Sequence, residues 1–118
     1  MITVYGIKNC DTCRKALKWL DAEGIEHKFH DFRKDGLDQS TVSGWIDEIG
    51  IDTLLNRRGT TWRKLPEADQ ASAETGNAAA LLTENPTLMK RPIFDLGTKR
   101  LIGFKADAQE ALKATNQS

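Results

Sequence analysis

The two cysteines of the chain, Cys10 and Cys13, are three positions apart and could carry redox chemistry. A Cys-x-x-Cys motif at the point where a strand gives way to a helix is typical of thiol–disulfide chemistry. Unpaired backbone N–H groups and the positive dipole end at a helix start stabilise a thiolate. We therefore predict Cys10 as the nucleophile, and Cys13, one helical turn further on, as the resolving thiol that releases the product.

Cys13 also fits a second interpretation, as a small buried hydrophobic residue. Residues at helical spacing form the apolar face of the helix expected over residues 14–22 and the turn before it: Cys13, Ala16, Leu17 and Leu20. Free cysteine is among the residue types most often buried. The sequence leaves both roles of Cys13 open.

Polar residues beside the cysteines are candidates for holding a substrate. Lys8 and Arg14 flank the motif, and nearby cations lower the pKa of a thiol. We predict that Lys8, Asn9 and Thr12 bind substrate next to Cys10.

Far downstream, Arg91 and Pro92 precede a short run that we expect to form a strand beside the first one. Arg91 could place a cation over an anionic substrate or over the Cys10 thiolate. A cis Arg91–Pro92 bond would leave backbone N–H and C=O groups near Cys10 free to bind an extended thiol peptide. An ordinary trans proline with a solvated arginine is the alternative.

A second group of cations lies over residues 57–64, which we expect to form a loop. It contains Arg57, Arg58, Arg63 and Lys64 together with Trp62. We predict that Arg57 and Arg58 hold the carboxylates of glutathione, an oxyanion or an acidic protein partner. A solvated face is the alternative interpretation.

A zinc site is the other chemistry that the residue types allow, because Cys10, Cys13, His27 and His30 occur in the order of a two-Cys, two-His finger. The histidines fall within an expected strand, where positions three apart point to opposite faces of the sheet. We therefore predict no metal site and no bound cofactor.

The composition points to one soluble domain without bulk affinity for nucleic acid or a membrane surface. The chain has 118 residues, and its 17 basic and 17 acidic side chains balance. No basic leader with an apolar core is visible, and no run has the length of a membrane span. We expect a cytoplasmic monomer, in which two cysteines indicate catalysis or metal binding more than a structural bridge.

The expected elements give a mixed α/β fold. Residues 2–5 and 25–32 are predicted strands around the helix of residues 14–22, which together form a βαβ unit. Residues 92–95 and 100–104 are a predicted hairpin, followed by a helix that begins at Asp107. Helical patterns fill the segment between. We predict one thioredoxin-like domain over residues 1–118, with a four-stranded mixed sheet in a core of about 1–37 and 89–118, and a helical insertion over about 38–88.

Several separated motifs make the chain resemble the arsenate reductase (ArsC)-like family, in its Spx/YffB-type branch. They are Tyr5-Gly6-Ile7-Lys8-Asn9-Cys10-Asp11-Thr12, Leu54-Leu55-Asn56-Arg57-Arg58-Gly59, Arg91-Pro92 and Gly103-Phe104. The resemblance implies a thioredoxin-like fold with a helical insert. It also implies that Cys10 is the catalytic cysteine, that Arg91 supports an oxyanion or thiolate, and that Pro92 is a cis-proline.

The resemblance carries three expectations about function. YffB-like members imply a glutathione-dependent thiol reductase acting on glutathione or a small thiol or disulfide, and this is our main expectation. Spx-like members imply a redox-sensing transcriptional regulator that binds RNA polymerase. Arsenate reduction is the third, and it fits less well, because arsenate reductases of this type have a histidine where this chain has Gly6 and carry a single cysteine here.

Overall fold

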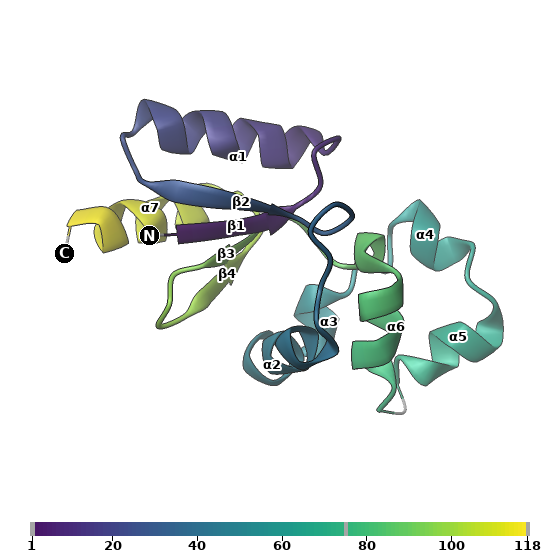
Figure 1. The fold of residues 1–118 in the computed structure, drawn as a ribbon. Coiled ribbons are helices and arrows are strands. Elements are labelled where there is room, and N and C mark those ends of the chain that lie inside the picture. Colours follow the sequence, from purple (N-terminus) through teal and green to yellow (C-terminus); the bar gives the residue numbers. More distant parts are fainter. Residues whose placement is uncertain (1, 75, 118) are drawn as a thin grey trace. The chain divides into compact units, whose positions relative to one another are not determined.

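The computed structural model describes residues 2–74 and 76–117 of the chain. The chain divides into two compact units. Met1–Asp35 and Arg91–Ser118 form the first unit, which carries the sheet, and Gly36–Lys90 forms the second, which is helical (Figure 1).

The sheet of the first unit has four strands in the order β2-β1-β3-β4. Their bounds are Ile2–Gly6 for β1, His27–Asp31 for β2, Ile93–Asp95 for β3 and Arg100–Ile102 for β4. β1 runs parallel to β2 and antiparallel to β3, which pairs with β4 in a hairpin. The mixed sheet and the strand order confirm the expected α/β fold, although β2 and β4 are shorter than the sequence pattern predicted.

One face of this sheet carries the core of the first unit. Ile2, Val4 and Gly6 alternate along β1 as buried residues, as expected for a strand with one covered face. Helix α1 (Asp11–Ala22) and helix α7 (Ala106–Gln117) contribute to the same core cluster. Its members are Ile2, Val4, Ala16, Leu20, Ile25, Phe94 and Leu112. The apolar stripe of α1 therefore fixes the orientation of the helix that begins just after Cys10.

Helix α1 begins earlier than the sequence pattern indicated. It starts at Asp11 rather than Arg14, and Cys10 occupies the N-cap position. The backbone N–H of Arg14 donates to the Cys10 carbonyl at 3.0 Å, which closes the first turn. Asp11 and Thr12 are both exposed, so this first turn adds little to the apolar pattern from which a helix start is predicted.

The second unit consists of short helices. They are α2 (Gln39–Ile49), α3 (Ile51–Leu54), α4 (Thr60–Arg63), α5 (Glu67–Ser72), α6 (Ala78–Glu84) and the 3₁₀ turn η1 (Pro86–Leu88). Helices α2 and α6 pack together, and an isolated bridge joins Leu55 to Met89. The prediction of a loop over residues 57–64 is wrong in its second half, where α4 forms. A single turn such as α4 is too short for an apolar period to reveal.

Among the residues that the structure describes, no helix combines the length and apolar character needed to cross a membrane.

Candidate active site

The turn that carries Cys10 is short and tightly bonded. β1 ends at Gly6, and α1 begins at Asp11. The Cys10 backbone N–H donates to the Ile7 carbonyl at 3.2 Å, and Cys10 itself has extended backbone angles, with φ −98° and ψ 121°. The Cys10 side chain is thus placed at the N-terminus of a twelve-residue helix, where the first backbone N–H groups lack helical partners.

Asp31 at the end of β2 anchors the start of this turn. Its carboxylate accepts the Lys8 N–H at 3.2 Å, the Arg33 N–H at 2.8 Å and the Lys34 N–H at 3.2 Å. Asp31 is only 8% exposed. Burial by itself raises the pKa of this carboxyl, but the backbone hydrogen bonds outweigh burial, and the pKa is lowered. Asp31 therefore joins the Lys8 backbone to a strand of the sheet.

Arg14 ties the other side of the turn to α1. Its Nε donates to the Lys8 carbonyl at 3.1 Å, and its Nη2 donates to Asn9 Oδ1 at 3.4 Å. A further Arg14 nitrogen lies 3.7 Å from the Asp11 carboxylate. Asn9 and Thr12, both predicted to bind substrate, are exposed beside Cys10. The Asn9 side chain also bonds within the turn itself.

The Cys10 thiol is activated by its neighbours. Partial burial raises the pKa of Cys10, but hydrogen bonding from the Cys13 backbone, the Cys13 thiol and the Arg91 side chain lowers it by more. The positive charge of Arg91 acts in the same direction. The net effect is a lowered pKa, so a larger fraction of Cys10 is thiolate at neutral pH than in a free cysteine.

The Cys13 thiol has the opposite character. It is 1% exposed, and burial is the main cause that raises its pKa to about 12. The neighbouring Cys10 raises the pKa of Cys13 further, whereas the Ile7 backbone and Arg91 oppose the shift. Both cysteines are free thiols in this structure. The two sulfurs therefore interact while differing in acidity, with Cys10 as the more acidic thiol and Cys13 as its hydrogen-bond partner.

Arg91 and Pro92 contribute to the site from the start of β3. The Arg91–Pro92 peptide bond is cis, as the family resemblance implied. The Pro92 carbonyl accepts the Gly103 N–H at 2.8 Å, so one of its two lone pairs already has a partner. Pro92 is fully buried. Arg91 is half-buried, and its side chain hydrogen-bonds to the Cys10 sulfur.

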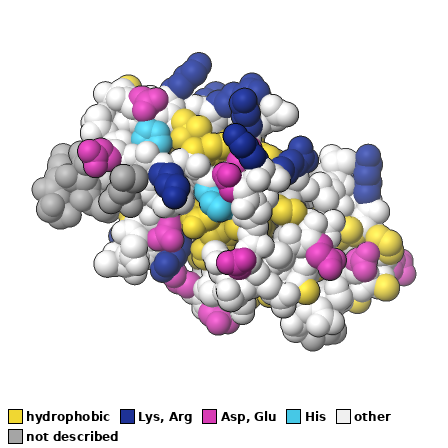
Figure 2. All heavy atoms as spheres, viewed as in Figure 1, with side chains coloured by type: hydrophobic (Ala, Val, Ile, Leu, Met, Phe, Trp, Pro, Cys, Tyr) yellow, Lys and Arg dark blue, Asp and Glu magenta, His cyan; other side chains and the backbone are white. Residues whose placement is uncertain are grey.

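A pocket of about 480 Å³ lies next to the cysteines, between α1 and the end of β2. Ile7, Leu17 and Phe29 line it with apolar groups, and Cys13 lies in its wall. Its charged lining is Lys8, Arg14, Asp31, Lys34 and Asp35. Figure 2 shows Lys and Arg side chains gathered along α1, the helix on which Arg14, Lys15 and Lys18 are exposed. The lining of the pocket thus combines apolar side chains with three basic and two acidic ones.

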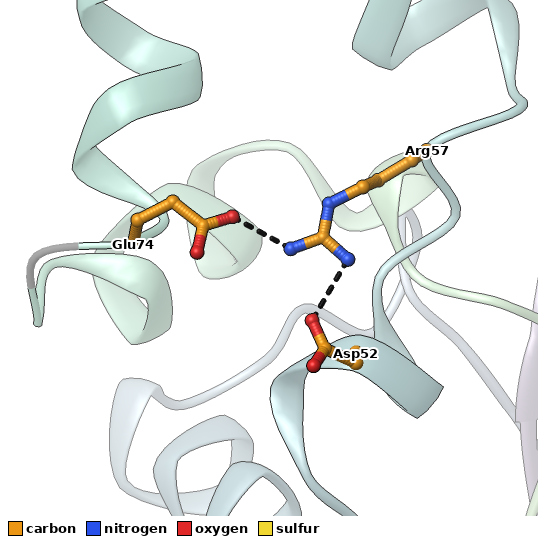
Figure 3. Close-up of polar contacts among 3 residues, drawn as sticks. All are labelled: Asp52, Arg57 and Glu74. Atoms are coloured by element: carbon orange, nitrogen blue, oxygen red, sulfur yellow. Dashed lines mark hydrogen bonds and ion pairs between the residues drawn. The ribbon is translucent and has the colours of Figure 1, made fainter.

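The predicted binding residues Arg57 and Arg58 belong to the second unit and have different surroundings. Arg57 donates to Asp52 at 2.9 Å and to Glu74 at 2.7 Å, as Figure 3 shows. Its guanidinium also lies 5.8 Å from the centre of the Trp62 ring. Glu74 and then Asp52 raise the pKa of Arg57 above its usual value. Arg58 is exposed, and its backbone N–H donates to Asn56 Oδ1 at 3.2 Å.

The two histidines lie in different settings. His27 Nδ1 is 2.9 Å from the Ile25 carbonyl, and its Nε2 is 3.6 Å from the Asp21 carboxylate. The His30 ring packs against Tyr5, with the ring centres 4.8 Å apart. Within residues 2–74 and 76–117, no group of three or more His, Cys, Asp or Glu side chains could hold a metal ion.

Sequence reasoning did not single out Asp31 or the close approach of Gly6 to Cys13. A Cβ on Gly6 would lie 2.5 Å from Cys13 Sγ. The signal for Asp31 is weak, since an acidic residue before a Lys-Asp-Gly turn is common at strand ends. Gly6 gives a clearer signal, because glycine inside a strand pattern often marks a close approach of another group.

Known proteins resemble the chain over nearly its whole length. The ArsC family model matches residues 5–112. An uncharacterized protein of Haemophilus influenzae is 52% identical over 111 residues, which cover 94% of this chain and 97% of the relative. The global transcriptional regulator Spx of Listeria innocua is 31% identical over 110 residues, 91% of this chain and 82% of the relative.

Solved structures are also similar to the chain over most of its length. A structure named YFFB protein superposes with a TM-score of 0.88 at 43% identity, covering 95% of this chain and 98% of that one. An arsenate reductase (ArsC) related protein from Brucella melitensis has a TM-score of 0.75, also at 43% identity, covering 93% and 92% of the two chains.

Proposed function

The chain belongs to the ArsC family, and within that family we propose that it is a cytoplasmic thiol oxidoreductase whose nucleophile is Cys10. The observation that carries this proposal is the difference between the two sulfurs. The pKa of Cys10 is lowered at the N-terminus of α1, whereas the pKa of Cys13 is raised to about 12. A dithiol with one acidic and one buried, protonated member is suited to stepwise disulfide exchange.

The reaction that we propose is the two-electron reduction of a substrate disulfide. The Cys10 thiolate attacks one sulfur of the substrate, forms a mixed disulfide and releases the other half as a thiolate. Cys13 then loses its proton and attacks the Cys10 sulfur, which forms the Cys10–Cys13 disulfide and releases the second half. Two glutathione molecules restore the dithiol and leave as glutathione disulfide, so electrons and protons balance.

We further propose that glutathione or a small disulfide approaches over the cationic side of the pocket. Lys8 and Lys34 line that pocket, and among the described residues neither makes an ion pair. Glutathione carries two carboxylates, which cations attract in this setting. Arg91 supports the thiolate rather than the substrate tail in this proposal, because its side chain hydrogen-bonds to Cys10.

Turnover of bis(2-hydroxyethyl) disulfide with glutathione as the reductant tests the proposal. The Cys10→Ser variant should fall to the uncatalysed rate, because the serine hydroxyl is not ionised near neutral pH. The Cys13→Ser variant should retain part of the turnover, because a second glutathione can resolve the mixed disulfide in place of Cys13. Full activity in Cys10→Ser protein would rule the proposal out.

A redox-sensing regulator is the second candidate, and the Spx relatives favour it. In that function the Cys10–Cys13 disulfide would change a protein-binding surface instead of being turned over. Binding of purified bacterial RNA polymerase to the oxidised and reduced forms separates the two candidates. Redox-dependent binding without turnover of the small disulfide favours the regulator, and the Cys10→Ser/Cys13→Ser double variant should then bind identically in both conditions.

A further inference from the structure

Gly6, the last residue of β1, lies directly against the Cys13 side chain. A Cβ built on Gly6 would be 2.5 Å from Cys13 Sγ and 3.5 Å from Cys13 Cβ. Non-bonded carbon and sulfur atoms do not approach to 2.5 Å, because dispersion wells lie at about 3.5–4.0 Å. The Cys13 sulfur therefore occupies the space that any side chain at position 6 would fill.

The backbone of Gly6 does not itself demand glycine. Six other glycines of the chain have positive φ, and Gly6 is not among them. An L-residue could adopt this strand conformation without strain. The requirement for glycine at position 6 thus comes from the neighbouring sulfur, not from the chain geometry.

The space around an added Cβ at position 6 is filled by side chains. Gly6 and Cys13 are both buried, and Phe29 Cε1 would lie 3.6 Å from the same Cβ. A methyl group at position 6 must therefore displace Cys13 Sγ from its place beside Cys10.

We propose that Gly6 is a positioning residue that seats the Cys13 sulfur for exchange with Cys10. The inference rests on the proposed function for its purpose, since it makes Cys13 a placed resolving thiol and not a buried hydrophobic residue. Disulfide formation depends on this placement, because the two Cβ atoms must lie about 3.5–4.5 Å apart with a restricted dihedral angle. Position 6 thereby sets how readily Cys10 and Cys13 form their bond.

Gly6→Ala is the direct test, with two readouts that do not depend on turnover. The rate of Cys10–Cys13 disulfide closure, measured with excess glutathione disulfide, should fall on the order of 10- to 100-fold, as expected for a displaced reacting group. The pKa of Cys10, followed by thiolate absorbance, should rise, because the Cys13 thiol that lowers it has moved. Gly44→Ala is the matched control, because Gly44 is exposed within α2 and nothing lies within 4 Å of an added Cβ.

A second background shows whether Gly6 acts through Cys13. In Cys13→Ala protein the sulfur is gone, so Gly6→Ala should leave the Cys10 pKa and the melting temperature close to those of the Cys13→Ala single variant. If Gly6→Ala alone does not fold, the Gly6→Ala/Cys13→Ala double variant should fold again. An equal effect of Gly6→Ala in both backgrounds would overturn the proposal, as would unchanged closure kinetics in the single variant.

Failure of the positioning role of Gly6 can be told apart from failure of the proposed enzyme function. If the protein reduces no disulfide but Gly6→Ala still slows closure and raises the Cys10 pKa, the enzyme proposal fails and the positioning role stands. If turnover depends on Cys10 while Gly6→Ala closes its disulfide at the parental rate, the positioning role fails alone.

Discussion

The Cys10 thiol and the Arg57 cluster, which consists of Asp52, Arg57 and Glu74, each involve an arginine, but the two arginines have different partners. Arg91 hydrogen-bonds to a thiol and shifts its pKa downward. Arg57 faces two carboxylates, at 2.9 and 2.7 Å, and its charge is more than offset (Figure 3). The sequence marks both as cations near candidate motifs. The contacts separate them: Arg91 interacts with the thiol of the candidate site, whereas Arg57 pairs with carboxylates of the helical unit.

A count of basic residues is a weak guide to substrate binding, because some of those residues already have acidic partners. An arginine that already has two acidic partners must lose one before it can hold an anionic substrate. Lys8 and Lys34, which line the pocket, make no ion pair among the described residues and have no such competition. The region around the Cys10 turn is therefore the better candidate for attracting an anion.

Replacing Arg91 should have the largest effect on chemistry. Arg91→Met removes the cation and hydrogen bond that lower the pKa of Cys10, so the pKa rises and the thiolate fraction at pH 7 falls. Each unit of pKa change is about tenfold in thiolate, partly offset because a more basic thiolate is more nucleophilic. Alkylation of Cys10 by iodoacetamide at pH 7 should slow several-fold.

The pH profile of the same reaction distinguishes this cause from general damage. Above both pKa values every Cys10 is ionised, so the Arg91→Met variant should react as fast as the parent or faster. Lys90→Met is the charge-matched control, since the Lys90 side chain is exposed and its backbone N–H, which the substitution keeps, donates to the Leu54 carbonyl. A profile of Arg91→Met that is lowered equally at every pH would contradict the assigned role.

Replacing Asp31 should have the next largest effect, on stability. Asp31→Asn weakens three backbone hydrogen bonds to a buried carboxylate, and we expect a loss of about 1–3 kcal/mol in the free energy of unfolding. Urea unfolding at pH 7 measures it. Asp38→Asn is the control, because the exposed Asp38 side chain makes no cap hydrogen bond, and its replacement should change stability by less than about 0.5 kcal/mol.

The effect of Asp31 should depend on pH in a defined direction. The folded pKa of Asp31 lies below that of an unfolded aspartate, about 3.9. Its stabilisation is therefore fully present above pH 3.9 and is lost as the pH falls through the folded value. The difference between parent and Asp31→Asn should stay constant around neutrality and shrink in acid. A difference that grows in acid would contradict this assignment.

The sheet could be predicted from the sequence because its signals are local. β1 alternates buried and half-buried residues, and the run from Cys13 to Leu20 has helical spacing, so the βαβ unit follows from short-range patterns. Cys10 could be singled out by its motif. The exact helix start could not, because the first turn of α1 is exposed.

The rest of the site depends on contacts between residues far apart in the sequence. Asp31 is bonded to backbone N–H groups, and one of them, that of Lys8, is 23 residues away, so no side-chain pattern signals the contact. The partnership of Arg57 with Glu74 spans 17 residues. The fit of the Cys13 sulfur against Gly6 depends on how α1 packs on β1. Such contacts are properties of packing, which a single sequence does not display.

The Arg57 cluster should give the smallest effect, and its salt dependence tests whether it is structural. Arg57→Ala should lower the free energy of unfolding by about 0.5–1 kcal/mol, because Asp52 and Glu74 are largely exposed and water screens the pairs. Much of that loss should disappear near 1 M salt, where the Debye length is about 3 Å. The part of the loss that comes from packing of the guanidinium on the Trp62 ring should remain at high salt. Arg58→Ala, which removes no side-chain ion pair among the described residues, should change stability by less than about 0.5 kcal/mol at either salt concentration. If Arg57→Ala instead leaves stability unchanged and weakens glutathione binding, the contrast with Arg91 is wrong, and Arg57 binds the substrate.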